Sequence, residues 1–110
     1  MTSCSRGDLV TIAVPGDYGK PRPALVIQSD LFSDHPSVTI LPVTSFLRSA
    51  AIFRILLEPG GETGLRKPSQ IMVDKIYTVA RDKIGKPIGR VSPETLVAVT
   101  RALAMCLGFA

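Results

Sequence analysis

Short apolar segments, separated by polar stretches rich in glycine and proline, follow one another over most of the chain. Val, Ile and Leu dominate these segments, and such residues favour β-strands. Five strands are predicted, at Leu9–Val14, Ala24–Gln28, Val38–Val43, Ile52–Leu57 and Gln70–Val79. A short helical turn is predicted at Arg81–Gly85 and a brief strand at Pro87–Val91. Most of the chain is therefore expected to be β-structure.

The last part of the chain has helical spacing instead. Ser92 is a good N-cap residue, and Pro93 suits the first helical position. Apolar residues then recur on one helical face, at Leu96, Val99, Leu103 and Leu107. We expect this helix to lie on a curled antiparallel sheet. The predicted fold is mainly β with a C-terminal helix: a small, SH3-like barrel whose single domain spans residues 1–110.

Composition changes this picture little. Apolar residues make up 45% of the 110 residues and charged residues 20%, which is ordinary for a folded protein with one modest core. Lys and Arg number 13 against 9 acidic residues, a net charge of +4. This excess fits a polyanionic partner such as RNA, but many proteins without a nucleic-acid role carry as much.

The two cysteines and the apolar runs bear on location. Cys4 and Cys106 lie near opposite ends of the chain without metal-ligand spacing, so free thiols in a reducing compartment are expected. The stretch Met1–Asp8 lacks the apolar core of a secretory signal. No apolar run approaches the roughly 18 residues of a membrane helix. The predicted location is the cytoplasm, without membrane contact.

Several kinds of catalysis are excluded by residue type. The chain has one histidine, His35, in a polar turn, so a histidine pair cannot operate within it. The carboxylates are scattered and form no metal-binding motif. There is neither a P-loop nor a GxGxxG motif. The sequence therefore predicts a site without metal or cofactor.

An arginine is the strongest remaining candidate. Arg22 lies between two prolines in the predicted loop Lys20–Pro23, which restricts its backbone. A guanidinium is a planar fork that matches phosphate oxygens. The alternative is an ordinary solvated loop arginine, and physical chemistry alone does not decide between the two.

Two further features have the same ambiguity. Thr44 and Ser45 end the third predicted strand, where their hydroxyls could bind a phosphate or simply close a turn. Asp74 and Lys75 interrupt the apolar fifth strand, where they could face solvent or line a groove.

Five motifs, taken in order, resemble those of the MazF/PemK family of type II toxins. They are Arg6–Val10, Arg22–Ile27, Leu41–Ser45, Gly64–Leu65 with Ser69–Thr78, and Ile88–Ser92. Each is short and weak alone, but their common order and spacing are specific. The resemblance runs from about Arg6 to Gly108.

The resemblance implies a metal-independent, sequence-specific endoribonuclease that cuts single-stranded RNA. In the implied reaction the RNA's own 2′-hydroxyl attacks the adjacent phosphorus, giving a 2′,3′-cyclic phosphate and a free 5′-hydroxyl. Arg22 matches the family's essential arginine, which would stabilise charge in the transition state. Thr44 matches the threonine that works with it.

The resemblance also implies RNA-binding residues and partners. The RNA-binding candidates are Asp17, Tyr18, Lys20, Ser45, Arg48 and Asp74. The implied assembly is a homodimer with RNA in a groove across its interface. The implied inhibitor is an antitoxin whose acidic, disordered tail covers that groove, and such a tail suits a basic chain.

Some positions depart from the family pattern. Asp17 stands where glutamate is usual, Met72 where some members have an arginine, and Lys75 where glutamine is common. These changes bear on which RNA is cut. Two alternatives remain open: a CcdB-like toxin of the same fold that binds gyrase through its C-terminal helix, and an inactive relative that only binds RNA or sequesters an antitoxin.

Overall fold

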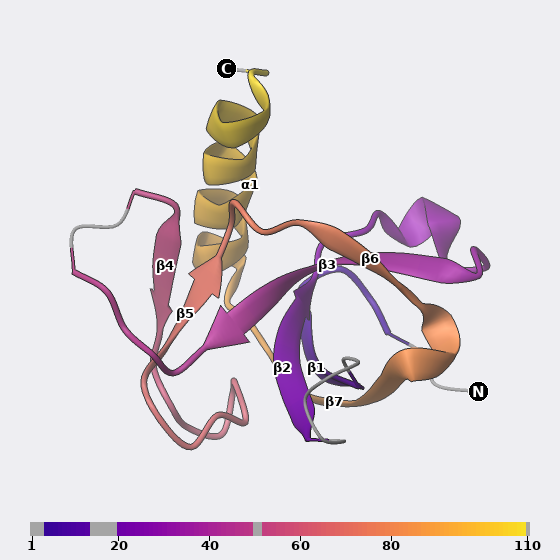
Figure 1. Ribbon diagram of the computed structural model, residues 1–110, viewed down its shortest axis with the longest axis horizontal. Helices are drawn as coiled ribbons and strands as arrows, with labels where there is room; N and C mark the ends of the chain where they lie inside the picture. The colour runs from indigo at the N-terminus through magenta and orange to yellow at the C-terminus, as the bar shows by residue number, and fades with distance from the viewer. Residues whose placement is uncertain (1–3, 14–19, 50–51, 110) are drawn as a thin grey trace.

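The computed structural model describes residues 4–13, 20–49 and 52–109. Seven strands, two short 3₁₀ turns and one helix follow in the order β1 (Asp8–Ala13), β2 (Pro21–Val26), η1 (Asp30–Phe32), β3 (Ser37–Thr44), β4 (Arg54–Leu57), β5 (Ser69–Met72), β6 (Tyr77–Ala80), η2 (Arg81–Lys83), β7 (Ile84–Arg90) and α1 (Pro93–Leu107). The strands curl around one another, and α1 stands against the side that carries β4 and β5 (Figure 1).

All strand pairs are antiparallel, and the sheet order is β4-β5-β3-β2-β1-β7. Strand β6 also pairs with β3. The strands thus form a barrel-like sheet with one C-terminal helix. The predicted fold class is confirmed.

Strand β1 is buried on both faces, which explains why its sequence is a continuous apolar run. Leu9 belongs to a first core cluster that includes Leu57 of β4 and Val99 of α1. Val10 and Ile12 belong to a second cluster on the opposite face, inside the curl of the sheet. The strand therefore separates a core under the helix from a core inside the barrel.

Helix α1 begins where its sequence predicts, and a glycine ends it. The Ser92 hydroxyl accepts a hydrogen bond from the Thr95 N–H at 3.1 Å, which satisfies one unpaired donor of the first turn. At the other end Gly108 adopts a left-handed conformation with φ 83°, which glycine reaches without steric cost. With 15 residues, α1 is too short to cross a membrane, and no other described helix is long and apolar enough to do so.

The prediction of one continuous fifth strand is wrong. It is divided into β5 and β6, with a turn that contains Asp74 and Lys75. Val43 and Ile40 of β3 lie three positions apart, whereas their partners Ile71 and Tyr77 lie six apart. Three extra residues therefore bulge out between β5 and β6.

The second strand begins earlier than predicted, at Pro21, so Arg22 lies in a strand and not in a loop. The prolines are tolerated because residues 21–23 pair only with β1, whereas β3 pairs with Ala24–Val26. Pro42 is placed similarly, between the part of β3 that pairs with β6 and the part that pairs with β5. The last strand, β7, is longer than the predicted Pro87–Val91 and begins at Ile84.

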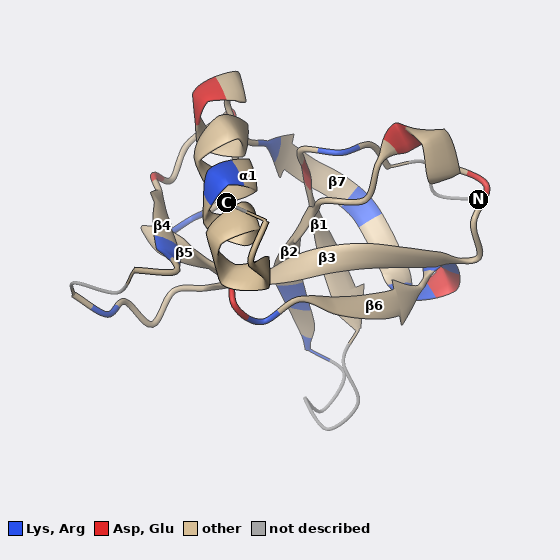
Figure 2. Ribbon diagram, turned by 90° about the horizontal axis from the view of Figure 1, so that it is seen from above, with Lys and Arg blue, Asp and Glu red and all other residues tan. Residues whose placement is uncertain are grey.

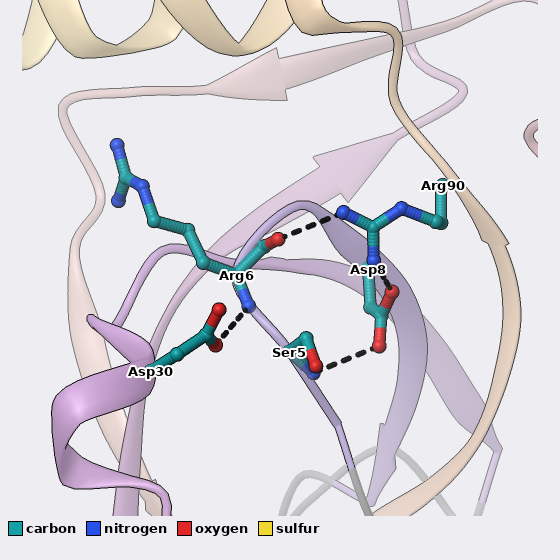
Figure 3. Close-up of polar contacts among 5 residues, drawn as sticks. All are labelled: Ser5, Arg6, Asp8, Asp30 and Arg90. Atoms are coloured by element: carbon teal, nitrogen blue, oxygen red, sulfur yellow. Dashed lines mark hydrogen bonds and ion pairs between the residues drawn. The ribbon is translucent and has the colours of Figure 1, made fainter.

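A polar cluster at the start of β1, which we call the N-terminal clasp, joins distant parts of the chain (Figure 3). It consists of Ser5, Arg6, Asp8, Asp30 and Arg90. Arg90 forms an ion pair with Asp8 and also donates to the Arg6 carbonyl at 3.1 Å. Asp8 accepts from the Ser5 N–H at 2.8 Å, and Asp30 accepts from the Arg6 N–H at 2.9 Å. The clasp therefore ties β1 to β7 and to η1.

Candidate active site

The pairing of β2 with β3 brings two of the predicted site residues together. Ala24 is the partner of Pro42 in this antiparallel pair. Extending the register by two residues brings Arg22 level with Thr44. Both line a cleft of about 510 Å³ whose other walls come from β5 and β6. Because Ala24 belongs to the core inside the barrel, the cleft lies at the end of that core.

Arg22 is exposed at the edge of this cleft, on a strand and not on a turn. Its position is fixed by a backbone pair with Ile12 of β1. A guanidinium on a paired strand is better positioned than one on a loop, because the backbone around it moves less.

The hydroxyl of Thr44 has a defined orientation. Its oxygen accepts a hydrogen bond from the Phe46 N–H at 3.0 Å, which closes the turn after β3. A hydroxyl that accepts in this way keeps its own proton for donation. Thr44 lines the cleft, so that proton is available to an anion there. The structural and the ligand-binding interpretations of Thr44 are therefore compatible.

The structure adds cleft residues that sequence reasoning missed. Tyr77 of β6 and Met72 of β5 line the cleft together with the predicted Ser45. Tyr77 lies after the bulge that separates β5 from β6, which the apolar pattern did not reveal. An aromatic ring beside an anion site can stack on a nucleic-acid base.

The other predicted residues do not line the cleft: two line a second pocket, one is exposed before β2, and two lie outside the residues that the structure describes. Arg48 and Asp74 line a separate pocket of about 270 Å³, with Arg54 and Lys75. Lys20 is exposed just before β2 and is not among the residues that line the cleft. Asp17 and Tyr18 lie outside the described residues. His35 is exposed in the turn before β3, as its polar surroundings predict.

The chemistry of the cleft follows from its residue types. Arg22, Thr44, Ser45 and Tyr77 supply hydrogen-bond donors, and the described residues that line the cleft include neither a histidine nor a carboxylate. Nor do the described residues contain a group of three or more His, Cys, Asp or Glu that could hold a metal ion. The cleft can hold and stabilise an anion, but its described residues offer no nucleophile paired with a base.

Charge alone would not have located this site. Lys and Arg lie on several elements, including β2, β4, β7 and α1, without gathering on one face (Figure 2). The cleft is defined instead by strand register, which brings particular donors to one place. The fold and the cleft together define a class: a small barrel-like protein with a candidate anion-binding site.

The family follows from comparison with known sequences. The profile of the PemK-like, MazF-like toxins of type II toxin–antitoxin systems matches residues 5–107. A probable endoribonuclease MazF of Mycolicibacterium smegmatis is 43% identical over 106 residues, covering 96% of this chain and 97% of the relative. Endoribonuclease MazF9 of Mycobacterium tuberculosis is 30% identical over 92 residues, covering 78% and 77%. The chain belongs to the PemK-like, MazF-like toxin family.

Solved structures agree on the fold. One, described as an endoribonuclease in complex with its cognate antitoxin from a mycobacterial species, has a TM-score of 0.80 at 23% identity and covers 98% of both chains. A MazE–MazF crystal structure from Deinococcus radiodurans has a TM-score of 0.80 at 21% identity, with the same coverage. The resemblance identified from sequence motifs is confirmed.

Proposed function

We propose that this toxin is an endoribonuclease that cuts single-stranded RNA without a metal, with Arg22 and Thr44 as its catalytic pair. The observation that carries the proposal is the meeting of these two side chains at one cleft through the register of β2 and β3. Membership of the MazF-like family, and curated relatives named as endoribonucleases, support the activity. The same membership argues against the gyrase-binding alternative.

The proposed reaction uses the substrate as its own nucleophile. The 2′-oxygen of the RNA loses its proton to water and bonds to the adjacent phosphorus. The bond from phosphorus to the 5′-oxygen breaks, and that oxygen takes a proton from water. The products are a 2′,3′-cyclic phosphate and a 5′-hydroxyl. No enzyme nucleophile is required, which fits a cleft that is lined mainly by donors.

Each member of the pair has a distinct part. The Arg22 fork would bind the non-bridging phosphate oxygens, whose negative charge increases in the transition state. Arg22 would remain protonated, because an arginine pKa is about 12 or higher. Thr44, whose oxygen accepts from the Phe46 N–H, would donate a hydrogen bond to a phosphate oxygen.

Other residues would hold the rest of the RNA. We assign this part to Ser45 in the cleft, to Arg48 and Asp74 in the second pocket, and to Asp17, Tyr18 and Lys20 before and at the start of β2. Tyr77 joins them as a base-stacking candidate.

The proposed partners are a second copy of the chain and an antitoxin with an acidic, disordered tail. Large apolar side chains are exposed around β4, on α1 and just after α1, namely Phe46, Ile52, Leu56, Val97, Met105 and Phe109. Exposed apolar groups of this size are typical of surfaces that bind proteins. A related structure contains an endoribonuclease with its cognate antitoxin, which supports the second partner. We further propose that residues 1–110 form one toxin domain that acts in the cytoplasm, where its RNA substrates lie.

The experiment is cleavage of labelled single-stranded RNA of varied sequence by the purified protein in EDTA. We expect fragments with 5′-hydroxyl ends that sequencing maps to one short motif. A substrate with a 2′-deoxy sugar at the cut position should remain intact, because its nucleophile is missing. Cleavage that requires added metal, or cleavage of the deoxy substrate, would contradict the proposed mechanism. The absence of any cut would favour a toxin that only binds its target.

A further inference from the structure

Three cations line one pocket beside the bulge between β5 and β6. Arg48 comes from the loop after β3, Arg54 from β4 and Lys75 from the bulge itself. The pocket also contains one carboxylate, that of Asp74. Three cations against one carboxylate give this pocket a net positive charge.

Two of these cations are available to a ligand. Neither the Arg48 guanidinium nor the Lys75 ammonium makes a hydrogen bond or ion pair with another described residue. Arg54 is half-buried and uses its NH1 group, which donates to the Phe46 carbonyl at 3.3 Å and to Gln70 at 3.2 Å. A guanidinium has five N–H donors, so Arg54 retains others.

The pocket adjoins the cleft along two chain segments. In the loop after β3, Ser45 lines the cleft and Arg48 lines the pocket. At the end of β5, Met72 lines the cleft and Lys75 lines the pocket. Arg54 is the cross-strand partner of Met72, so its backbone lies about one strand spacing, roughly 5 Å, from a cleft residue.

Gln70 of β5 holds the loop that carries Arg48. Its side-chain oxygen accepts from the Arg48 N–H at 3.0 Å, and its side-chain nitrogen donates to the Arg48 carbonyl at 3.0 Å. The same oxygen accepts from Arg54. One amide therefore fixes the position of both arginines relative to β5.

We propose that Arg48, Arg54 and Lys75 form a second phosphate-binding subsite, which holds the RNA backbone one or two linkages from the bond that is cut. The inference rests on the proposed function, because it takes RNA as the ligand of the adjoining cleft. Gln70 is the positioning residue of this subsite. Its role is to hold the loop so that the Arg48 guanidinium faces the same phosphate as Lys75.

The first test is a binding titration. The probe is a fluorescent single-stranded oligonucleotide that contains the mapped cut site with a 2′-deoxy sugar there, or mixed-sequence RNA if no cut is found. The double variant Arg48→Ala/Lys75→Ala should bind about tenfold more weakly, and its slope of log affinity against log salt should fall by about 0.7 for each lost phosphate contact. The control Lys86→Ala/Arg101→Ala removes two exposed cations from β7 and α1 and should bind as the parent does.

The second test locates the phosphate. Methylphosphonate linkages, which carry no charge, replace single phosphates of the probe in turn. The parent should lose affinity when the cut phosphate or one nearby linkage is neutralised, whereas the double variant should lose affinity only when the cut phosphate is neutralised. A double variant that binds as tightly as the parent, or that keeps the penalty at the nearby linkage, would overturn the subsite. Parent protein that binds no RNA would overturn it as well.

Gln70→Ala tests the positioning role without changing charge. Gln28 provides a matched control, since its amide holds a different loop by donating to Phe32 and Ser37 and accepting from Thr39. Gln70→Ala should weaken binding severalfold and reduce the penalty at the nearby linkage, whereas Gln28→Ala should change neither. Equal effects of the two variants would refute the positioning role.

Cleavage is scored separately, so the two proposals can fail independently. If the parent cuts RNA and the double variant binds as the parent does, the subsite is refuted and the proposed function stands. If the parent cuts nothing, but the double variant binds RNA more weakly and no longer shows the penalty at the nearby linkage, the subsite stands and the proposed function fails.

Discussion

The N-terminal clasp and the cleft both contain arginines, but their surroundings differ. In the clasp, Arg90 is paired with the carboxylate of Asp8, whose side chain is only 11% exposed. Arg6 donates to the Ile27 carbonyl and, at 2.7 Å, to the Thr100 hydroxyl of α1. At the opposite end of the β1–β2 pair, Arg22 is exposed at the cleft, and Arg48 lines the second pocket.

From this difference we expect the clasp arginines to contribute to stability and the cleft arginines to contribute to function. A guanidinium that satisfies a buried carboxylate or an orphan carbonyl contributes to the folded state. An exposed guanidinium at the edge of a cleft contributes little to folding. Mutations in the clasp should therefore lower stability, and mutations in the cleft should lower cleavage activity.

The largest expected effect is on the cleft side. Arg22→Ala should reduce cleavage by about 100- to 1,000-fold, because it removes the donor closest to the developing phosphate charge. Its free energy of unfolding should change by less than about 0.5 kcal/mol, as is usual for an exposed side chain. Single-turnover cleavage and urea unfolding measure the two quantities.

Arg66→Ala is the control for this experiment, because Arg66 is an exposed arginine of the loop between β4 and β5 and is not among the residues that line the cleft. It should cleave at the parent rate. Parent-like cleavage by Arg22→Ala would show that the catalytic pair has been assigned wrongly.

Mutation of the clasp should lower stability and leave cleavage unchanged. Arg90→Ala removes the ion pair with Asp8 and the bond to the Arg6 carbonyl, so it should cost about 1–3 kcal/mol of stability. Thermal unfolding should begin several degrees lower, while cleavage per folded molecule stays unchanged. Lys86→Ala, in the same strand, is the exposed control. If Arg90→Ala instead lost cleavage activity at unchanged stability, the assignment of the clasp to stability would be wrong.

Thr44 sharpens the comparison, because its hydroxyl serves both a turn and the cleft. Thr44→Val should slow cleavage by about 5- to 10-fold, the effect of one neutral hydrogen bond. Thr44→Ser keeps the hydroxyl and should retain most of the activity. Parent-like cleavage by Thr44→Val, with a loss in Thr44→Ser, would assign the effect to the methyl group and not to the hydroxyl.

The smallest effect is expected at Cys4, beside the clasp. Burial raises the pKa of the Cys4 thiol, although the Arg81 guanidinium beside it acts in the opposite direction. The folded protein therefore binds the thiol proton more tightly than the unfolded chain does. In a Cys106→Ala background, the rate of alkylation should rise with pH around a midpoint that is higher for folded protein than for protein in urea. A lower midpoint in the folded protein would contradict the dominance of burial.

The sequence predicted those elements whose local signals agree with their tertiary surroundings. Helix α1 has a capping serine, a proline and an apolar face, and its start matches the prediction. The break between β5 and β6 was missed because the apolar residues continue across it. The sequence signal of this break is the odd spacing between Val73 and Ile76. In one continuous strand, that spacing would place the two apolar side chains on opposite faces of the sheet.

Three of the predicted site residues, Arg22, Thr44 and Ser45, line one cleft, but the sequence did not predict the geometry of that cleft. Arg22 was expected on a loop because two prolines flank it, but β3 leaves that part of β2 unpaired and so tolerates prolines in a strand. The division of Arg48 and Asp74 from the cleft depends on the bulge and on the Gln70 amide. Such features arise from pairing between distant segments, which a single sequence pattern does not specify.

The clasp also has a consequence for the timing of folding. Asp8 and Arg90 are separated by 82 positions, and the Arg6 contact with Thr100 spans 94. A ribosome adds about 5–20 residues per second, from the N-terminus onward. Strand β1 therefore waits for its β7 partner while the 82 positions between Asp8 and Arg90 are synthesised, and long-range pairing of this kind is slow. A nascent toxin chain should remain harmless until β7 and α1 have left the ribosome.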